Sequence, residues 1–313
     1  MPRQVVIKCG DALLESWVKN MSSLLPNDFQ VLPYNSDEIA PSNVAYIIGW
    51  KPDAHWINTF PSLRALVSIG SGVDHIANLA DLRADVPVIR TVSPDLIQRM
   101  REYVAMCVLA WHRQLVPIIE TNRKHKWDRF AVDVAGSVHV GVMGYGSMGK
   151  AVAATLASLG YAVSVWADSE REGLPFKYYR GRGQLYEFAA ECDVVVCLLP
   201  LTPQTSNILD YGFMSTMRRG GCLVNAARGG HLVDDDVIRA TSDGTLSLAF
   251  VDGLRQEPLG EDSPLWDAPG VIVTCHSAAY ISPDAGPRII AANIERFDAG
   301  EVVSPMYDPG RGF

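Results

Sequence analysis

One stretch decides the fold of this chain: Val138-His139-Val140-Gly141-Val142-Met143-Gly144-Tyr145-Gly146-Ser147-Met148-Gly149. An apolar run of strand character leads into glycines spaced as G-x-G-x-x-G, and an alanine-rich helical pattern follows over 150–159. In this context the glycines allow a tight turn, a close approach of the backbone to a pyrophosphate, and packing of helix on strand. The helix start would offer N–H groups to the phosphates. The stretch predicts a dinucleotide site formed by Gly144, Gly146, Ser147, Met148 and Gly149, whereas the glycines alone would indicate only a turn.

The choice between NAD and NADP depends on the end of the next predicted strand, 162–166. An acidic residue about 20 residues beyond the glycines can bind the ribose hydroxyls and repel a 2′-phosphate. Asp168 lies 19 residues after Gly149, and Arg171 follows closely enough to offer a phosphate contact. We therefore expect NAD or NADP as the cofactor, with NAD slightly favoured. The alternative interpretation of Asp168 is a solvated loop aspartate.

Short apolar runs alternate with helical patterns along the whole chain, which is typical of α/β proteins with parallel sheets. In the first third, strands are predicted at 5–9, 44–49, 65–69 and 88–91, and helices at 11–25 and 53–60. A long helical pattern over 93–123 would connect two domains. Beyond it, strands are predicted at 138–143, 162–166, 193–199, 222–225, 246–251 and 271–274, and a final helix at 288–300. The predicted fold class is α/β, with two doubly wound parallel sheets.

Composition limits the classes of function. The chain has 313 residues, of which 48% are hydrophobic and 20% charged, so two domains with large cores are possible. Its formal net charge of −8 argues against general binding of nucleic acid. The first residues are too few and too quickly charged for a signal peptide, and no apolar run reaches the roughly 18 to 20 residues that span a bilayer. We expect a cytoplasmic protein without nucleic-acid or membrane partners.

The six cysteines are scattered, without a Cys-x-x-Cys pair or histidines at zinc spacing. This pattern predicts free thiols in a reducing cytosol and no metal site. Cys275 is the one cysteine next to a candidate catalytic residue, so a reactive thiol there stays open.

Three separated segments downstream of the glycines carry groups that suit the reduction of a 2-keto acid: 225–230, 252–257 and 274–276. Arg228 can bind a carboxylate and a carbonyl with its planar fork. His276 can give or take a proton near neutral pH, and a carboxylate can orient it and favour its protonated form. Taken singly, Arg228 could be a surface turn residue, His276 a core histidine and Glu257 a solvated acid. Their occurrence together behind a dinucleotide fingerprint favours the chemical interpretation.

These motifs, taken in order, resemble the D-isomer-specific 2-hydroxyacid dehydrogenase family and, within it, the glyoxylate/hydroxypyruvate reductase A group. The resemblance covers nearly the whole chain. Besides the G-x-G-x-x-G, it is carried by Ile69-Gly70-Ser71-Gly72-Val73-Asp74-His75, Leu199-Pro200-Leu201-Thr202-Pro203-Gln204-Thr205, Val224-Asn225-Ala226-Ala227-Arg228-Gly229-Gly230, Glu257-Pro258-Leu259, Thr274-Cys275-His276 and the closing Asp308-Pro309-Gly310-Arg311-Gly312-Phe313.

The resemblance implies a flavodoxin-like substrate domain over 1–98 and 282–313, and a Rossmann dinucleotide-binding domain over 99–281. The active site would lie in the cleft between them. The implied reaction transfers a hydride between NAD(P)H and a short 2-keto acid, such as glyoxylate or hydroxypyruvate, giving the D-2-hydroxy acid. We also expect a homodimer.

By the same resemblance, Arg228 is the substrate arginine, His276 the acid and base, and Glu257 its partner. The expected substrate-binding residues are Trp50, Gly70, Ser71, Gly72, Met100 and Tyr103. Besides the fingerprint and Asp168, the expected cofactor-binding residues are Pro200, Thr205, Ala226 and Asp252, the last accepting from the nicotinamide carboxamide. His75 and His112 are interpreted as structural.

The chain departs from the family pattern at two points, where Cys275 stands for the usual proline and Ala167 for the usual acid, with Asp168 next.

Other functions on the same scaffold remain open at this stage, because fold alone does not define function. One is a dinucleotide-sensing binding protein or corepressor, which has no need of Arg228, Glu257 and His276 together. Others are dehydrogenases for a different acid. A formate dehydrogenase would call for an amide in place of Glu257. A 3-phosphoglycerate dehydrogenase would favour more basic groups near the substrate and often an appended regulatory domain.

Overall fold

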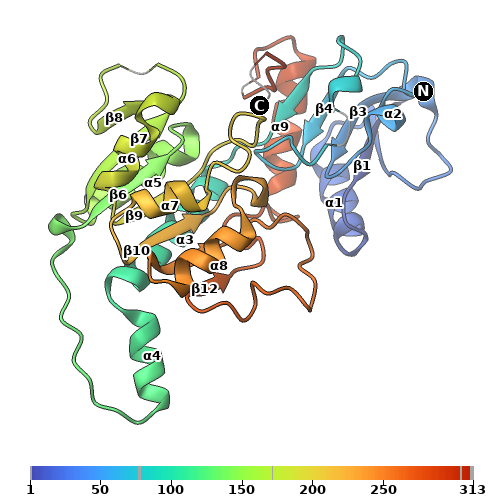
Figure 1. Ribbon diagram of the computed structural model, residues 1–313. Coiled ribbons are helices and arrows are strands. Elements are labelled where there is room, and N and C mark those ends of the chain that lie inside the picture. Colours follow the sequence, from blue (N-terminus) through green and yellow to red (C-terminus); the bar gives the residue numbers. More distant parts are fainter. Residues whose placement is uncertain (1, 77–78, 171, 304, 311–313) are drawn as a thin grey trace. The chain divides into compact units, whose positions relative to one another are not determined.

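The computed structural model describes residues 2–76, 79–170, 172–303 and 305–310, and the chain forms two compact units (Figure 1). Unit 1 consists of 1–96 and 280–313, and unit 2 of 97–279. The domain boundaries expected from the sequence lie two residues further along the chain at each crossing. Arg171 and the final residues 311–313, which entered the sequence analysis, lie outside the described residues.

Unit 1 is built on a five-stranded parallel sheet in the order β2-β1-β3-β4-β5. Its strands are β1 Arg3–Lys8, β2 Phe29–Pro33, β3 Val44–Gly49, β4 Ala65–Ser68 and β5 Val88–Arg90. Its helices are α1 Asp11–Leu24, α2 Ala54–Ile57 and α9 Gly286–Asp298, with short 3₁₀ turns η1 Pro41–Asn43 and η2 Leu79–Asp81. This strand order is the flavodoxin-like one, so the predicted class of unit 1 is confirmed.

Unit 2 holds a seven-stranded parallel sheet in the order β12-β11-β10-β9-β6-β7-β8. Its strands are β6 His139–Met143, β7 Ala162–Ala167, β8 Lys177–Arg180, β9 Val194–Cys197, β10 Gly221–Asn225, β11 Leu246–Val251 and β12 Val271–Val273. Its helices are α3 Pro94–His112, which starts in unit 1, α4 Leu115–Arg123, α5 Ser147–Ser158, α6 Leu185–Glu191, α7 Tyr211–Thr216 and α8 Asp234–Ser242, with η3 Ala135–Ser137, η4 Arg182–Gln184 and η5 Gly229–His231. The strand order reverses between β6 and β9, as in a Rossmann fold.

Burial on both faces explains why the central strands are continuous apolar runs. Every residue of β9 is buried, and its side chains alternate between two core clusters. Val195 and Cys197 join the cluster on one face, whereas Val194 and Val196 join the cluster on the other. Successive side chains of the strand point to opposite faces, so the sheet packs against a layer of helices on each face.

The expectation of one long helix over 93–123 was wrong. The structure has two helices, α3 and α4, and between them Gln114 takes a left-handed backbone conformation with a φ of 57°. Pro117 gives the physical reason, because it has no N–H to donate to the carbonyl of Arg113 and its ring would clash there. Figure 1 shows α4 and the segment after it extending away from the sheet of unit 2. None of the described helices is long and apolar enough to cross a membrane.

The final helix, α9, belongs to unit 1 and is held there by one carboxylate. Asp298 accepts hydrogen bonds from Arg3 at 2.7 Å, from the Tyr46 hydroxyl at 2.8 Å, and from Arg64. Burial by itself raises the pKa of Asp298, but the hydrogen bonds from Arg3 and Tyr46 and the charge of Arg64 outweigh it, so the pKa lies below its usual value. The carboxylate thus ties α9 to β1, to β3 and to the residue before β4.

We predict that Asp298→Ala lowers the free energy of unfolding by about 2–3 kcal/mol, because several donors lose a charged acceptor. Asp28→Ala is the control, since Asp28 is exposed and bonds Arg3 alone, and it should cost about 1 kcal/mol or less. A group whose pKa falls on folding stabilises the fold above its unfolded pKa and loses this effect in acid. The difference between parent and Asp298→Ala should therefore shrink below about pH 4. Urea unfolding across pH measures it, and equal losses for both variants would contradict it.

Candidate active site

The carboxyl ends of five neighbouring strands carry the candidate residues of unit 2. The fingerprint follows β6, the segment 198–205 follows β9, and Arg228 lies shortly after β10. Asp252 follows β11 directly, and the segment 274–276 follows β12. Because the sheet is parallel, these ends meet at one edge, where open α/β sheets bind their ligands.

The glycines of the fingerprint fit a bound pyrophosphate. A Cβ on Gly149 would lie 1.8 Å from the carbonyl oxygen of Gly144, so only glycine allows this turn to pack against α5. Gly144 itself has a φ of 97°, and a Cβ there would lie 2.8 Å from the carbonyl oxygen of Leu198. A Cβ on Gly146, in contrast, would meet nothing within 4 Å. The turn is thus closed on its protein side and open at Gly146, beside the start of α5 at Ser147.

Asp168 is the first residue after β7 and is exposed. Its Oδ1 lies 3.7 Å from the place of a Cβ on Gly181, at the end of the neighbouring strand β8. The nearby cations already have partners, since Arg180 pairs with Glu170 at 3.2 Å and Arg182 donates to the carbonyl of Gln204. This edge of the described structure therefore presents carboxylate at the place where the adenosine ribose is expected.

Arg228 lies in a tight turn packed against the residues that follow β11. Asn225 donates from its side chain to the carbonyl of Arg228 at 3.0 Å, and Arg228 Nη1 donates to the carbonyl of Ala227 at 2.9 Å. A Cβ on Gly229 would lie 2.0 Å from the carbonyl carbon of Leu254, so the two backbones touch. Glycine is required here for this close approach.

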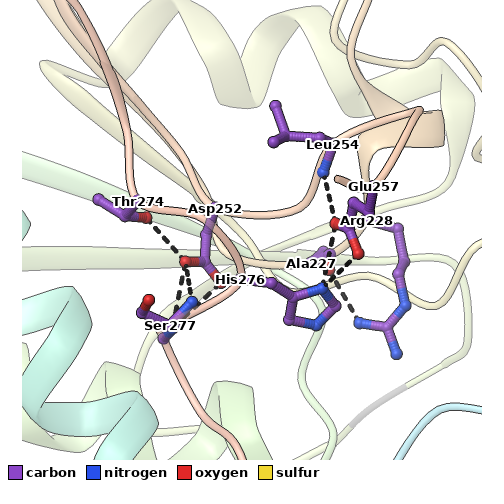
Figure 2. Close-up of polar contacts among 9 residues, drawn as sticks. Ala227, Arg228, Asp252, Leu254, Glu257, Thr274, His276 and Ser277 are labelled. Carbon is purple, nitrogen blue, oxygen red and sulfur yellow. Dashed lines mark hydrogen bonds and ion pairs between the residues drawn. The ribbon is translucent and has the colours of Figure 1, made fainter. Parts of the chain in front are cut away.

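Glu257 and His276 form the pair predicted from the sequence (Figure 2). His276 Nδ1 lies 3.0 Å from Oε1 and 2.9 Å from Oε2 of Glu257. The backbone N–H of Leu254 donates to Oε1 of the same carboxylate at 2.9 Å, which fixes its orientation. With Nδ1 bound to Glu257, the ring directs Nε2 away from it, and the pair is partly exposed to solvent. This geometry suits a histidine that exchanges a proton with a ligand.

Asp252 clamps the turn that carries His276. Its Oδ1 accepts from the Thr274 hydroxyl at 2.7 Å and from Ser277 N at 2.7 Å (Figure 2). It also accepts from Ala278 N at 3.1 Å. The backbone N–H of His276 donates to the carbonyl of Asp252 at 2.9 Å. The carboxylate is buried, and its interactions hold the position of the imidazole. Its expected contact with the nicotinamide carboxamide stays a prediction.

The Gly70–Gly72 turn of unit 1 directs its carbonyls into the protein. Ser71 O accepts from Arg90 Nε at 2.6 Å, and the carbonyl oxygens of Gly70 and Gly72 both lie 2.9 Å from Ser68 Oγ, whose proton serves one at a time. Among the described residues, the N–H groups of this turn have no hydrogen-bond acceptor. Such N–H groups can receive an anion.

The other predicted pocket residues divide between the units. Trp50 lies in unit 1, where its ring stacks on His75 with centroids 4.1 Å apart. Met100 and Tyr103 lie on the buried face of α3 in unit 2, and the Tyr103 hydroxyl is 2.8 Å from Thr274 Oγ1. Burial raises the pKa of Tyr103 well above its ordinary value, so the hydroxyl stays protonated. Their roles in substrate binding stay predictions.

The segment after β9 is internally braced. Thr205 Oγ1 donates to the carbonyl of Pro200 at 2.7 Å and accepts from Thr202 N at 2.9 Å. Ala226, another expected cofactor-binding residue, is buried and lies two residues before Arg228 in the sequence. His112 is buried between the Tyr161 hydroxyl and the carbonyl of Asp133, each at 2.8 Å, as a structural histidine would be.

The cysteines all have free thiols, and Cys275 is the exposed one among them. In the described ranges, no three His, Cys, Asp or Glu side chains are arranged to hold a metal ion.

Sequence reasoning missed the residues that position the site: Ser68, Arg90, Asn225 and His231. Asn225 stands in the quoted motif, but its amide was given no role. His231 directly follows the motif that ends at Gly230, and this position could have indicated that it helps to place Arg228. Ser68 and Arg90 end β4 and β5, and a parallel sheet brings such ends together.

Fold and site together define a dinucleotide-dependent oxidoreductase, and comparison with known proteins identifies its family. The family model for the NAD binding domain of D-isomer specific 2-hydroxyacid dehydrogenases matches residues 105–278. The chain belongs to the D-isomer-specific 2-hydroxyacid dehydrogenase family.

Relatives match over nearly the whole chain. Glyoxylate/hydroxypyruvate reductase A from Serratia proteamaculans is 30% identical over 304 residues, 96% of each chain. A D-isomer specific 2-hydroxyacid dehydrogenase from Xanthobacter autotrophicus Py2, solved with NADPH and MES, is 31% identical, with a TM-score of 0.92 and 100% of both chains covered. The NADPH-dependent glyoxylate/hydroxypyruvate reductase from Sinorhizobium meliloti, solved with NADP and sulfate, is 30% identical, with a TM-score of 0.89 and 100% of both chains covered.

Proposed function

We propose that this chain is an NAD(P)H-dependent reductase that converts short 2-keto acids, such as glyoxylate and hydroxypyruvate, into D-2-hydroxy acids. The observation that carries the proposal is the arrangement of Arg228 and the Glu257–His276 pair at strand ends beside the dinucleotide fingerprint. The names of the relatives from Serratia and Sinorhizobium support the substrate class.

Arg228 binds and polarises the substrate in this proposal. Its guanidinium can hold a carboxylate through two parallel hydrogen bonds and can stabilise negative charge on the keto oxygen. The N–H groups of the Gly70–Gly72 turn bind the substrate carboxylate as well.

His276 supplies the proton. Glu257 holds Nδ1 and stabilises the charged ring, so Nε2 can protonate the substrate oxygen. The fingerprint glycines, the start of α5, Asp168, Pro200 and Thr205 would hold the cofactor. When bound, the reduced nicotinamide supplies the hydride.

The rival interpretation, a dinucleotide-sensing corepressor, does not require an oriented proton donor. The contacts of Glu257 with both His276 Nδ1 and Leu254 N weigh against it. We also propose a cytoplasmic location, which the six free thiols support.

A substrate panel tests the proposed function. The enzyme should oxidise NADH or NADPH with glyoxylate and hydroxypyruvate, and should use phenylpyruvate with a lower kcat/KM, because the substrate-binding residues expected from the sequence include the large side chains of Trp50, Met100 and Tyr103. Following the nicotinamide absorbance measures each rate. Absence of turnover with every 2-keto acid would refute the reductase assignment, whereas faster phenylpyruvate reduction would refute only the size limit.

Variants at the catalytic pair test the proton donor. His276→Ala should lower kcat for reduction by about 10²-fold or more, the usual scale of general acid catalysis, with little change in cofactor affinity. Glu257→Gln replaces the carboxylate that holds His276 Nδ1 with a neutral amide, so kcat for reduction should fall as well. Arg228→Lys should raise KM and lower kcat, because an ammonium lacks the bidentate fork. Near-normal turnover of His276→Ala would exclude it as the acid.

The preference between NADH and NADPH depends on Asp168. Although solved relatives hold NADP or NADPH, this chain has the exposed carboxylate of Asp168 directly after β7, where a 2′-phosphate would meet repulsion. We predict a higher kcat/KM with NADH than with NADPH. Asp168→Asn should narrow the difference, and Glu172→Gln, outside the strand end, should leave it unchanged. A large NADPH preference in the parent would overturn this prediction.

We propose that the functional state is a homodimer formed through the segment 106–134. Of the fourteen exposed large apolar side chains in the described structure, seven lie there: Met106, Leu109, Leu115, Ile118, Ile119, Trp127 and Val134. Trp127 is 89% exposed, and α4 has no buried residue. Such a concentration of exposed apolar groups marks an interaction surface.

Charge favours a second copy of this chain as the occupant. Residues 113–134 contain five Lys or Arg and three Asp or Glu, a net charge of +2, so the remainder of the chain carries −10. A basic, apolar segment on an acidic molecule is complementary to the body of another copy.

Sedimentation velocity tests the dimer. The parent should sediment as a dimer, and Ile118→Glu combined with Trp127→Glu should give a folded monomer, because charges would be buried without partners. Leu13→Glu is the matched control, since Leu13 is similarly exposed on α1 of unit 1, and it should stay dimeric. A monomeric parent, or a double variant that remains dimeric, would exclude this interface.

A further inference from the structure

His231 is fully buried, with 0% of its surface exposed, although the proposed reaction does not use it. It ends the 3₁₀ turn η5, three residues after Arg228. A buried imidazole needs hydrogen-bond partners, because an unpaired polar group in the interior costs free energy. Its ring finds them on two different segments.

The two ring nitrogens join the segment after β9 to the turn of Arg228. Nε2 lies 3.2 Å from the carbonyl oxygen of Pro200, and that oxygen can only accept a hydrogen bond. Nδ1 lies 3.0 Å from the carbonyl oxygen of Arg228 and 3.3 Å from its backbone nitrogen, so it donates to the first or accepts from the second according to which ring nitrogen carries the proton. Pro200 O also accepts from Thr205 Oγ1. One side chain therefore contacts an expected cofactor-binding residue and the substrate arginine.

Backbone hydrogen bonds extend this connection. Asn207 N donates to the carbonyl of Gly230 at 2.9 Å, and Leu209 N donates to the carbonyl of His231 at 2.9 Å. A Cβ on Gly230 would lie 2.7 Å from a methyl carbon of Leu201, so the segments are also in close apolar contact. A displacement of one segment would thus be transmitted to the other.

The start of the segment after β9, at Leu198, contacts the fingerprint. Leu198 N donates to the carbonyl of Met143 at 2.9 Å, and Leu198 O is the atom that a Cβ on Gly144 would approach. The reversal of strand order between β6 and β9 lies here, where doubly wound sheets bind dinucleotides. A continuous series of contacts runs from the fingerprint through Pro200 and His231 to Arg228.

We propose that His231 is a positioning residue that couples occupancy of the dinucleotide site to the orientation of Arg228. Cofactor and 2-keto acid would then bind with positive cooperativity, and each would strengthen the other by the same factor. The inference rests on the proposed function, since it takes Arg228 as the group that binds the substrate carboxylate.

The coupling factor is measured with oxamate, an unreactive analogue of a 2-keto acid. Calorimetry gives the Kd of the reduced cofactor for the free enzyme and for the enzyme saturated with oxamate, and their ratio is the coupling factor. The parent should show a ratio of about 5 or more, within the usual range of coupling between sites. A purely structural role would lower the melting temperature without changing the ratio, because both Kd values refer to the same folded molecules.

Three variants separate the two ring contacts. His231→Asn can replace Nδ1 but does not reach Pro200, and His231→Gln can replace Nε2 but not Nδ1. His231→Phe keeps the ring volume and removes both. Each should bring the ratio to within about twofold of one, because coupling requires both contacts. His139→Asn is the matched control, since His139 lies at the amino end of β6 and contacts Ser164 Oγ at 3.0 Å, and it should keep the parent ratio.

The outcomes separate this proposal from the proposed function. A parent ratio of one, or a parent-like ratio in the His231 variants, would overturn the coupling while leaving turnover of glyoxylate intact. Absence of turnover in the parent would overturn the function instead. Should His231→Phe fail to fold, the Asn and Gln variants, which keep one polar contact each, decide the question.

Discussion

Parallel pairing of the strands in unit 2 is the constraint on which the site depends. In a parallel sheet all strands point the same way, so residues that follow β6, β9, β10, β11 and β12 reach one edge. The fingerprint, Arg228, Asp252 and His276 are far apart in the sequence, yet each lies just beyond a strand. The pairing in turn requires strands that are apolar on both faces, and β9 and β10 are buried throughout. The packing that stabilises the sheet therefore also fixes where the chemical groups lie.

The same burial made most of the fold predictable from sequence. Central strands are continuous apolar runs, and the fingerprint fixes the place of β6, so the sheet of unit 2 follows from pattern. The strands β2 and β8 escaped prediction because polar residues interrupt their apolar runs: β2, Phe-Gln-Val-Leu-Pro, contains Gln30, and β8, Lys-Tyr-Tyr-Arg, has charged residues at both ends. The other two edge strands, β5 and β12, are uninterrupted apolar runs over Val88–Ile89 and Val271–Val273 and were predicted. Pro117 does indicate the break between α3 and α4 in the sequence, but the apolar residues around it keep a helical spacing and so suggested one continuous helix.

The residues of the candidate site also fall into those that the sequence predicts and those that it does not. The contact between Glu257 and His276 was predictable because hydride transfer to a 2-keto acid demands an oriented proton donor, whereas the roles of these two residues and of Arg228 in the reaction stay predictions. The contacts of His231 and Arg90 were not predictable, because each residue acts on a backbone carbonyl, and sequence does not reveal which carbonyl a folded chain brings near. Chemistry restricts the residue type of a reacting group, whereas a positioning group is defined only by its contacts.

The turn at Cys275 shows how such contacts compensate for a departure from the family pattern. Cys275 and His276 have φ values of 54° and 56°, a conformation that costs about 1–3 kcal/mol for each residue and that proline, with φ fixed near −65°, cannot adopt. At the position where the resemblance implies a proline, this chain has a left-handed turn. Asp252 accepts from Thr274, Ser277 and Ala278 there, and hydrogen bonds to a charged group contribute about 1.5–3 kcal/mol each. The buried carboxylate can therefore offset the strain of this turn and hold the backbone that carries His276 in place.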